Sequence, residues 1–186
     1  MFLPNEAVAA ACRSRLLDVQ INWPLTCTAL AGRLIDTPLV EAAAAATIAV
    51  ETMRLFRPVH EFGGTEYLNR MYDEGQRAAR LGNTPGPDGD GARYCGRGTV
   101  QITGRANYRK YGRIIGVDLE GVPGLALNPK NAAEILAAYF QQVNMKAAAE
   151  ARDWHRCREL VNGGTNGLDE FMGFVNALLL ALAVPS

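Results

Sequence analysis

Apolar residues recur along this chain every three or four positions, the spacing that places side chains on one face of an α-helix. A capping residue followed by proline marks two helix starts, at Thr37-Pro38 and Asn128-Pro129, and Asp153 has the properties of a third cap. The chain is therefore predicted to be mainly helical. The predicted helices cover about residues 6–17, 22–35, 38–52, 129–149, 153–160 and 168–183.

The middle of the chain has a different pattern. Residues 57–91 are dense in Gly, Pro, Asn and Asp, which predicts mostly loop with a short helix inside residues 66–79. The Gly-rich stretch that follows predicts a turn or short strand at residues 99–103. No internal repeat or low-complexity linker divides the 186 residues, a length that suits one domain burying roughly 70% of its unfolded surface. The predicted fold is one mainly α domain, residues 1–186, with at most a small β-hairpin.

Composition and charge narrow the classes of function. The four cysteines form no Cys-x-x-Cys pair, so neither a zinc site nor a disulfide scaffold is predicted. The formal net charge is zero and no nucleic-acid-binding module is recognisable, so no nucleic-acid partner is expected. The apolar stretches at residues 39–50 and 171–184 fall short of the roughly 20 residues that span a bilayer, which favours core helices over stable membrane insertion. The first residues lack a basic start followed by an apolar run, which predicts synthesis in the cytoplasm without a signal peptide.

The stretch from residue 94 to 112 has the composition of a sugar-binding surface. It reads Tyr-Cys-Gly-Arg-Gly-Thr-Val-Gln-Ile-Thr-Gly-Arg-Ala-Asn-Tyr-Arg-Lys-Tyr-Gly. Its glycines let the backbone approach a polymer closely, and Gln101, Thr103 and Asn107 can pair with hydroxyl and acetamido groups. The alternative interpretation is a Gly-rich hairpin that joins two helices. Six basic residues lie in this region without an acidic residue between them, which predicts a positive potential that would attract an anionic wall polymer: Arg93, Arg97, Arg105, Arg109, Lys110 and Arg113.

Three motifs in this chain resemble those of the family 19 glycoside hydrolases, which include plant-type chitinases and bacteriophage endolysins. Residues 94–112 are similar to the family's Gly-Arg-Gly-x-x-Gln-[Ile/Leu]-[Ser/Thr]-x-x-x-Asn-Tyr core. Residues 81–91, Leu-Gly-Asn-Thr-Pro-Gly-Pro-Asp-Gly-Asp-Gly, resemble a segment of the endolysin-like branch, and residues 161–169 resemble its Ile-Asn-Gly-Gly-x-Asn-Gly-x-x-Asp element. The resemblance implies a lysozyme-like helical catalytic domain with two lobes around a cleft, without a separate wall-binding module.

The resemblance also implies a pair of catalytic carboxyl groups. Glu51 aligns with the family's catalytic glutamate, and the apolar residues before it would keep its carboxyl protonated, as a general acid needs. Glu61 resembles the second carboxylate of the endolysins, which activates water as a general base, although Glu66 or Asp73 could take this role. Thr103 aligns with the residue that orients the attacking water. The alternative for Glu51 is an ordinary surface glutamate at a helix end.

Further residues match family positions that bind substrate or shape the cleft. By resemblance, Gln101, Asn107 and Asn162 would bind substrate, Tyr94 and Arg97 would shape the cleft, and Tyr108 would stack on a sugar or pack in the core. The chain departs from the family at Asp169-Glu170-Phe171, where relatives carry an Asp-Arg pair whose arginine supports the catalytic carboxylates. One supporting cation is therefore either missing or replaced by Arg54 or Arg97. No cofactor or metal is predicted, because Asp88-Gly-Asp90-Gly lacks the other ligand positions of a calcium loop.

Together these patterns predict a monomeric endolysin-type enzyme that hydrolyses β-1,4 bonds of peptidoglycan by an inverting mechanism and acts on the cell wall after release. Two alternatives remain open at this stage, a chitinase and a catalytically inactive glycan-binding protein. A lytic-transglycosylase reaction, which needs one acidic residue and no activated water, is also open.

Overall fold

The structure, a computed structural model, describes residues 1–84, 86 and 88–183. Helices dominate it, with a two-stranded antiparallel sheet of β1 (Val59–His60) and β2 (Arg97–Gly98), in which Val59 pairs with Gly98 and His60 with Arg97. An antiparallel bridge between Arg97 and Ile102 closes a small hairpin over residues 97–102. The predicted mainly α fold with a small hairpin is therefore confirmed. Pro85 and Pro87, within the motif at residues 81–91, lie outside the described residues.

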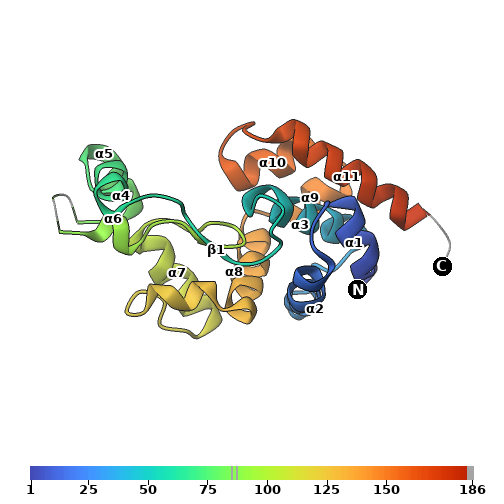
Figure 1. The fold of residues 1–186 in the computed structure, drawn as a ribbon, viewed down its shortest axis with the longest axis horizontal. Helices are drawn as coiled ribbons and strands as arrows, with labels where there is room; N and C mark the ends of the chain where they lie inside the picture. Colours follow the sequence, from blue (N-terminus) through green and yellow to red (C-terminus); the bar gives the residue numbers. More distant parts are fainter. Residues whose placement is uncertain (85, 87, 184–186) are drawn as a thin grey trace.

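The helices form two groups on either side of the hairpin and α8 (Figure 1). One group contains α4 (Thr65–Tyr72), α5 (Gly75–Leu81), α6 (Asp90–Arg93) and α7 (Arg105–Ile115). The other contains α1 (Asn5–Ala11), α2 (Leu16–Gly32), α3 (Pro38–Glu51), α9 (Met145–Glu150), α10 (Trp154–Asn162) and α11 (Leu168–Ala183). The 3-10 helix η1 (Pro123–Leu127) leads into α8 (Pro129–Gln142), which packs against α2 and α7 and so joins the two groups.

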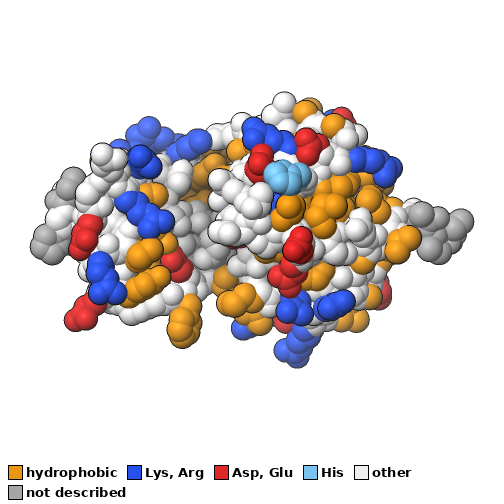
Figure 2. Space-filling model, turned by 90° about the horizontal axis from the view of Figure 1, so that it is seen from above, with side chains coloured by type: hydrophobic (Ala, Val, Ile, Leu, Met, Phe, Trp, Pro, Cys, Tyr) orange, Lys and Arg blue, Asp and Glu red, His pale blue; other side chains and the backbone are white. Residues whose placement is uncertain are grey.

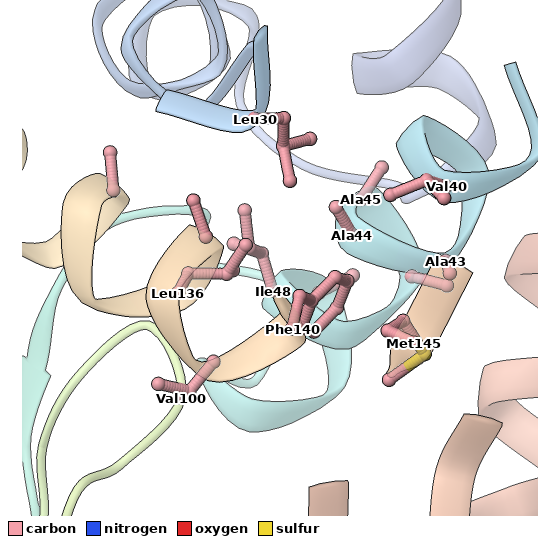
Figure 3. Packing of buried hydrophobic residues seen from close by; sticks show 14 of the residues in the cluster. Leu30, Val40, Ala43, Ala44, Ala45, Ile48, Val100, Leu136, Phe140 and Met145 are labelled. Carbon is pink, nitrogen blue, oxygen red and sulfur yellow. The ribbon is translucent and has the colours of Figure 1, made fainter. Parts of the chain in front are cut away.

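Helix α3 is the centre of the larger group. Its alanine run, residues 42–46, is completely buried, and these small side chains allow α11 and α9 to pack closely against it. Leu136 and Phe140 of α8 point toward Ile48 of α3, and Met145 closes the cluster from α9 (Figure 3). Each fully buried large apolar side chain contributes about 1.5–3 kcal/mol to the stability of the folded protein. This packing therefore fixes the direction of α3 and the place where it ends. It ends at Glu51.

The predicted caps are confirmed, since they depend on local chemistry. The Thr37 hydroxyl accepts a hydrogen bond from the Val40 N–H, Asn128 caps α8, and the Asp153 carboxylate accepts from the Arg156 N–H. The predicted bounds of the third and last helices agree closely with α3 and α11.

Several predicted helix boundaries are wrong. The helix expected over residues 129–149 is interrupted by Asn144, whose φ of 56° is left-handed and ends α8 before α9 begins. Likewise, Arg13 (φ 52°) separates α1 from α2, and Pro24 lies inside α2 instead of near its start. The short helix expected within residues 66–79 is two helices, α4 and α5, and α7 was not predicted.

None of the helices in the described part of the chain is both long and apolar enough to cross a bilayer. The four cysteines are buried free thiols.

Candidate active site

Glu51 forms a largely buried ion pair at the end of α3. Its Oε1 lies 2.5 Å from Nη1 of Arg158 on α10, and the side chains of Glu51 and Arg158 are 16% and 4% exposed. The guanidinium is held from its other side, because Nε donates to the carbonyl of Asn166 at 2.7 Å. Glu51 was expected in apolar surroundings that would keep it protonated, whereas the structure gives it a counterion. No hydrogen bond of the described residues involves its Oε2.

The segment after α10 also packs against the end of α3. Gly167 has a left-handed φ of 71°, and a Cβ at this position would lie 3.1 Å from Cγ1 of Val50 and 3.5 Å from a guanidinium nitrogen of Arg158. The motif at residues 161–169 therefore touches the helix end that carries Glu51. Tyr139 of α8 supports the same region, since its hydroxyl donates to the Leu160 carbonyl at 2.8 Å. Burial, with a smaller contribution from the nearby charge of Glu51, raises the pKa of Tyr139.

The arginine beside Glu51 is not one of the two expected from the sequence. Arg54 instead pairs with Glu170 at 3.4 Å on the surface. Arg97 is buried in the hairpin region, where Nη1 donates to the carbonyls of Arg93 and Cys95 and to the Tyr108 hydroxyl. The expectation that one of them replaces the missing arginine is wrong, because Arg158 supplies the cation.

Glu61 is fixed by two hydrogen-bond donors from separate parts of the chain. Its Oε2 accepts from the Gly96 N–H at 2.8 Å, and its Oε1 accepts from the Tyr72 hydroxyl at 2.6 Å. The Glu61 N–H also donates to the Gly96 carbonyl, which extends the β1–β2 pairing by one residue. Burial, the hydrogen bond to Glu61 and the Glu61 charge all raise the pKa of Tyr72, so its proton stays on the phenol at neutral pH. No sequence pattern indicates that Tyr72 contacts Glu61.

Gly96 must be glycine for this arrangement. A Cβ there would lie 2.8 Å from Oε1 of Gln101 and 3.1 Å from Oε2 of Glu61, closer than a side chain tolerates beside a fixed carboxylate. Gln101 has a left-handed φ of 51°, and its amide nitrogen donates to the carbonyls of Val59 and Gly98, both at 2.9 Å. Both of its N–H donors thus hold the hairpin, which leaves only its amide oxygen for a substrate.

Thr103 and Asn107 stabilise the turn that follows the hairpin. The Thr103 hydroxyl donates to the Gln101 carbonyl at 3.0 Å, and the Asn107 amide donates to the Thr103 carbonyl at 2.8 Å. Both side chains are half-buried. Their predicted roles, orienting water and binding substrate, stay predictions. Asn162 at the end of α10 is exposed and makes only a 3.5 Å contact with the Asn166 carbonyl, so its amide is accessible.

The aromatic residues of the motif lie inside the protein. Tyr108 is completely buried, and its hydroxyl donates to the Cys95 carbonyl at 2.7 Å. Tyr94 is also buried, packs against Tyr108 with ring centroids 5.5 Å apart, and donates to the Glu120 carbonyl. Tyr108 has no exposed surface, so stacking on a sugar is contradicted and Tyr108 packs in the core. Tyr94 is 3% exposed, and with Tyr108 and Arg97 it supports the backbone next to Gly96.

The two alternative candidates for the second carboxylate have different environments. Glu66 lies exposed in the first turn of α4. Asp73 is buried directly after α4, and burial, followed by the charges of Asp88 and Asp90, raises the pKa of its carboxyl. Neither carboxylate oxygen of Asp73 has a hydrogen-bond partner among the described residues.

Two of the six basic residues in this stretch have acidic partners from elsewhere in the chain. Arg105 pairs with Asp90 at 2.5 Å, and Arg109 pairs with Glu120 at 2.7 Å. Arg109 lowers the pKa of Glu120 through these hydrogen bonds. These two ion pairs reduce the expected positive potential of the stretch.

The surface is hollowed between the two groups of helices, as Figure 2 shows from above the view of Figure 1. Glu51 lies at the end of α3 in one group, and Glu61 lies directly after strand β1, in the segment that leads to α4 in the other group. The two carboxylates are thus held by different motifs, Glu51 by the segment around residues 158–167 and Glu61 by the Gly-rich motif.

Comparison with known proteins gives a consistent result. No protein-family model matches the chain. A glycosyl hydrolase family 19 domain-containing protein of Haemophilus influenzae is 36% identical over 115 residues, which cover 60% of this chain and 52% of that protein. The chain thus spans about half the length of the curated relative it matches.

Solved structures share the fold over the whole chain. Chitinase C from Streptomyces griseus HUT6037 matches with a TM-score of 0.74 at 17% identity, covering 100% of this chain and 96% of that one. A bacterial family 19 chitinase matches with a TM-score of 0.61 at 19% identity, covering 96% and 95%. As its motifs predicted, the chain is similar in sequence to a family 19 glycosyl hydrolase protein over part of its length, and it shares the fold of chitinases, one of them a bacterial family 19 chitinase.

Proposed function

We propose that this protein is an endolysin-type glycoside hydrolase that cleaves β-1,4 bonds of the peptidoglycan glycan. The observation that carries the proposal is the pair of fixed carboxylates, Glu51 beside Arg158 and Glu61 beside Gly96 and Tyr72. Glycosidic hydrolysis commonly uses two such groups, one to protonate the leaving oxygen and one to handle water or the sugar carbon. Relationship to family 19 and the hollow between the lobes support the same chemistry.

In the proposed inverting mechanism, Glu51 is the general acid. Arg158 contacts only Oε1, so Oε2 is the oxygen that would carry the proton to the leaving group. The proton leaves Oε2 as the glycosidic C–O bond breaks, and Arg158 then stabilises the carboxylate that forms.

Glu61 is the proposed general base. The Gly96 N–H and the Tyr72 hydroxyl orient both of its oxygens. Glu61 would take a proton from water as that water attacks the anomeric carbon from the face opposite the leaving group. Thr103 is proposed to orient this water through its hydroxyl.

The test uses the purified protein, Glu51→Gln and Glu61→Gln on purified peptidoglycan, with released fragments identified by mass spectrometry. Glu66→Gln is the matched control, because Glu66 is exposed on α4 and is the rival candidate for the base. We expect hydrated fragments with a reducing N-acetylmuramic acid end from the parent and the control, and none from the other two variants. NMR of the first product should show inversion at the anomeric carbon. Anhydro ends or retained configuration would refute the mechanism, and activity of Glu61→Gln would reassign the base.

Chitinase activity is the second candidate, favoured by the fold shared with chitinases. Parallel incubation with chitin oligomers decides between the two. Cleavage of these oligomers with intact peptidoglycan would establish the chitinase. Binding of either glycan without turnover, equal in the parent and Glu51→Gln, would establish a glycan-binding protein.

A further inference from the structure

The positively charged side chain of Arg77 lies near Glu61, with the Tyr72 ring between the two. Tyr72, the last residue of α4, donates its hydroxyl to Glu61, and the guanidinium carbon of Arg77 on α5 lies 5.4 Å from the centroid of the Tyr72 ring. This distance is within the range of a cation–π contact, which orients the guanidinium without neutralising its charge. The charge of Arg77 is felt at the Tyr72 hydroxyl, where it opposes the larger upward effects on that pKa.

Arg77 carries its charge without an acidic partner. The side chain is exposed, and no carboxylate within the described part of the chain lies within 4 Å of it, although Glu74 is three residues away. Arg105 and Arg109 on the same lobe, by contrast, are both paired with carboxylates. Arg77 is therefore available to an external anion at a small desolvation cost.

Two exposed aromatic rings lie on the same short segment as Glu61. Phe62 follows Glu61 directly and is 96% exposed, an unusual position for so large an apolar side chain. Tyr67 is also exposed, and its ring lies against Gly63, where a Cβ would be 2.8 Å from its Cδ1. Exposed aromatic rings are suitable surfaces for the apolar face of a pyranose.

We infer that Phe62, Tyr72 and Arg77 form a subsite beside Glu61 for a sugar that carries a carboxylate. Phe62 supplies apolar surface for the ring, and Arg77 forms a charge-assisted hydrogen bond with the carboxylate. In peptidoglycan the carboxylate comes from the lactyl group of N-acetylmuramic acid or from its stem peptide, whereas the N-acetylglucosamine of chitin has none. The subsite therefore selects the acidic glycan, and this inference rests on the proposed function.

The test measures binding, so that it does not depend on turnover. The Glu51→Gln variant is titrated by calorimetry with three probes: chitotetraose, an N-acetylglucosamine–N-acetylmuramic acid tetrasaccharide with free lactyl groups, and the same tetrasaccharide with dipeptide stems. Arg77→Gln is introduced into this background. Arg80→Gln is the matched control, since Arg80 is exposed on the same helix.

We expect Arg77→Gln to weaken binding of an acidic probe about 10-fold and that of chitotetraose less than about 2-fold, with no effect of Arg80→Gln. The acidic probe that responds identifies the carboxylate as lactyl or peptide. Equal loss for all probes, no loss for either acidic probe, or no binding of the acidic probes would overturn the inference. If the parent protein cuts neither glycan but the acidic probes still depend on Arg77, the proposed hydrolysis fails and the subsite stands.

Discussion

Replacing Arg158 by glutamine separates Glu51 from its counterion while leaving Glu51 in place. The two groups lie 2.5 Å apart with side chains 4% and 16% exposed, and the substitution also removes the bond to the Asn166 carbonyl. Breaking a buried ion pair by removing one partner costs about 3–5 kcal/mol. Because Glu51 keeps some contact with water, we expect the lower value, about 3 kcal/mol. In a protein of this size that lowers Tm by roughly 6–12 °C.

A double-mutant cycle separates the ion pair from general damage to the site. Glu51→Gln alone leaves the buried guanidinium without its partner, so it should destabilise as well. The double variant removes both charges and places two amides side by side. Its loss of unfolding free energy should be about 2 kcal/mol smaller than the sum of the losses in the two single variants. The measurement is urea unfolding of all four proteins. If the losses of the two single variants add up to that of the double variant within about 0.5 kcal/mol, the assignment of Arg158 as the partner of Glu51 is refuted.

Substitutions of Arg158 also test whether this residue positions Glu51 for catalysis. Arg158→Lys keeps a charge but loses the planar guanidinium that contacts Glu51 and Asn166 together. On the preferred glycan, we expect kcat to fall for Arg158→Gln and to be partly restored in Arg158→Lys, with KM little changed. A structural role alone would instead lower the amount of folded enzyme without changing kcat per active site, as determined by titration of active sites.

Three further predictions concern Glu61 and its surroundings. Tyr72→Phe removes one hydrogen-bond donor to Glu61 and should lower kcat/KM roughly 10-fold, with little change in Tm; an unchanged rate would contradict this role. Gly96→Ala should displace the Glu61 carboxylate and lower kcat/KM strongly, whereas Gly164→Ala, a control with no atom within 4 Å of the added Cβ, should not. Asp73→Asn should raise Tm at pH 7. Burial raises the pKa of Asp73 in the folded protein above its unfolded value of 3.8. The parent therefore loses stability as pH rises from 3.8 through the folded-state pKa. The gain in Tm of Asp73→Asn should vanish below pH 3.8, where the parent carboxyl is protonated in both states.

The parts of the fold that follow from local chemistry could be predicted from the sequence. Thr37 and Asn128 cap helices through their own side chains, so the starts of α3 and α8 are determined within four residues. The break at Asn144 and the turn at Arg13 require left-handed backbone at non-glycine residues, which no short pattern specifies. Helix α7 was missed because few of its residues are apolar and its glycine-rich approach suggested a turn.

The candidate site was only partly predictable for a related reason. Glu51 and Glu61 could be found by resemblance, but the groups that hold them come from distant positions: Arg158 is 107 residues from Glu51, and Gly96 is 35 from Glu61. The burial of Tyr108, and the pairing of the basic stretch with acidic partners, likewise depend on tertiary packing.

The source of the arginine illustrates how a site can retain its charge while its sequence changes. Phe171 lies in the element where relatives carry an Asp-Arg pair, and it is fully buried in the core at the start of α11. Helices α10 and α11 both pack against α3, joined by a loop that reverses direction through the left-handed Gly163 and Gly167. Either helix can therefore present a guanidinium to the end of α3. An apolar residue on α11 extends the core, and the cation comes from Arg158 on α10. Arginine introduced at Phe171 should thus not rescue Arg158→Gln, because a charge at this fully buried position would disrupt the core.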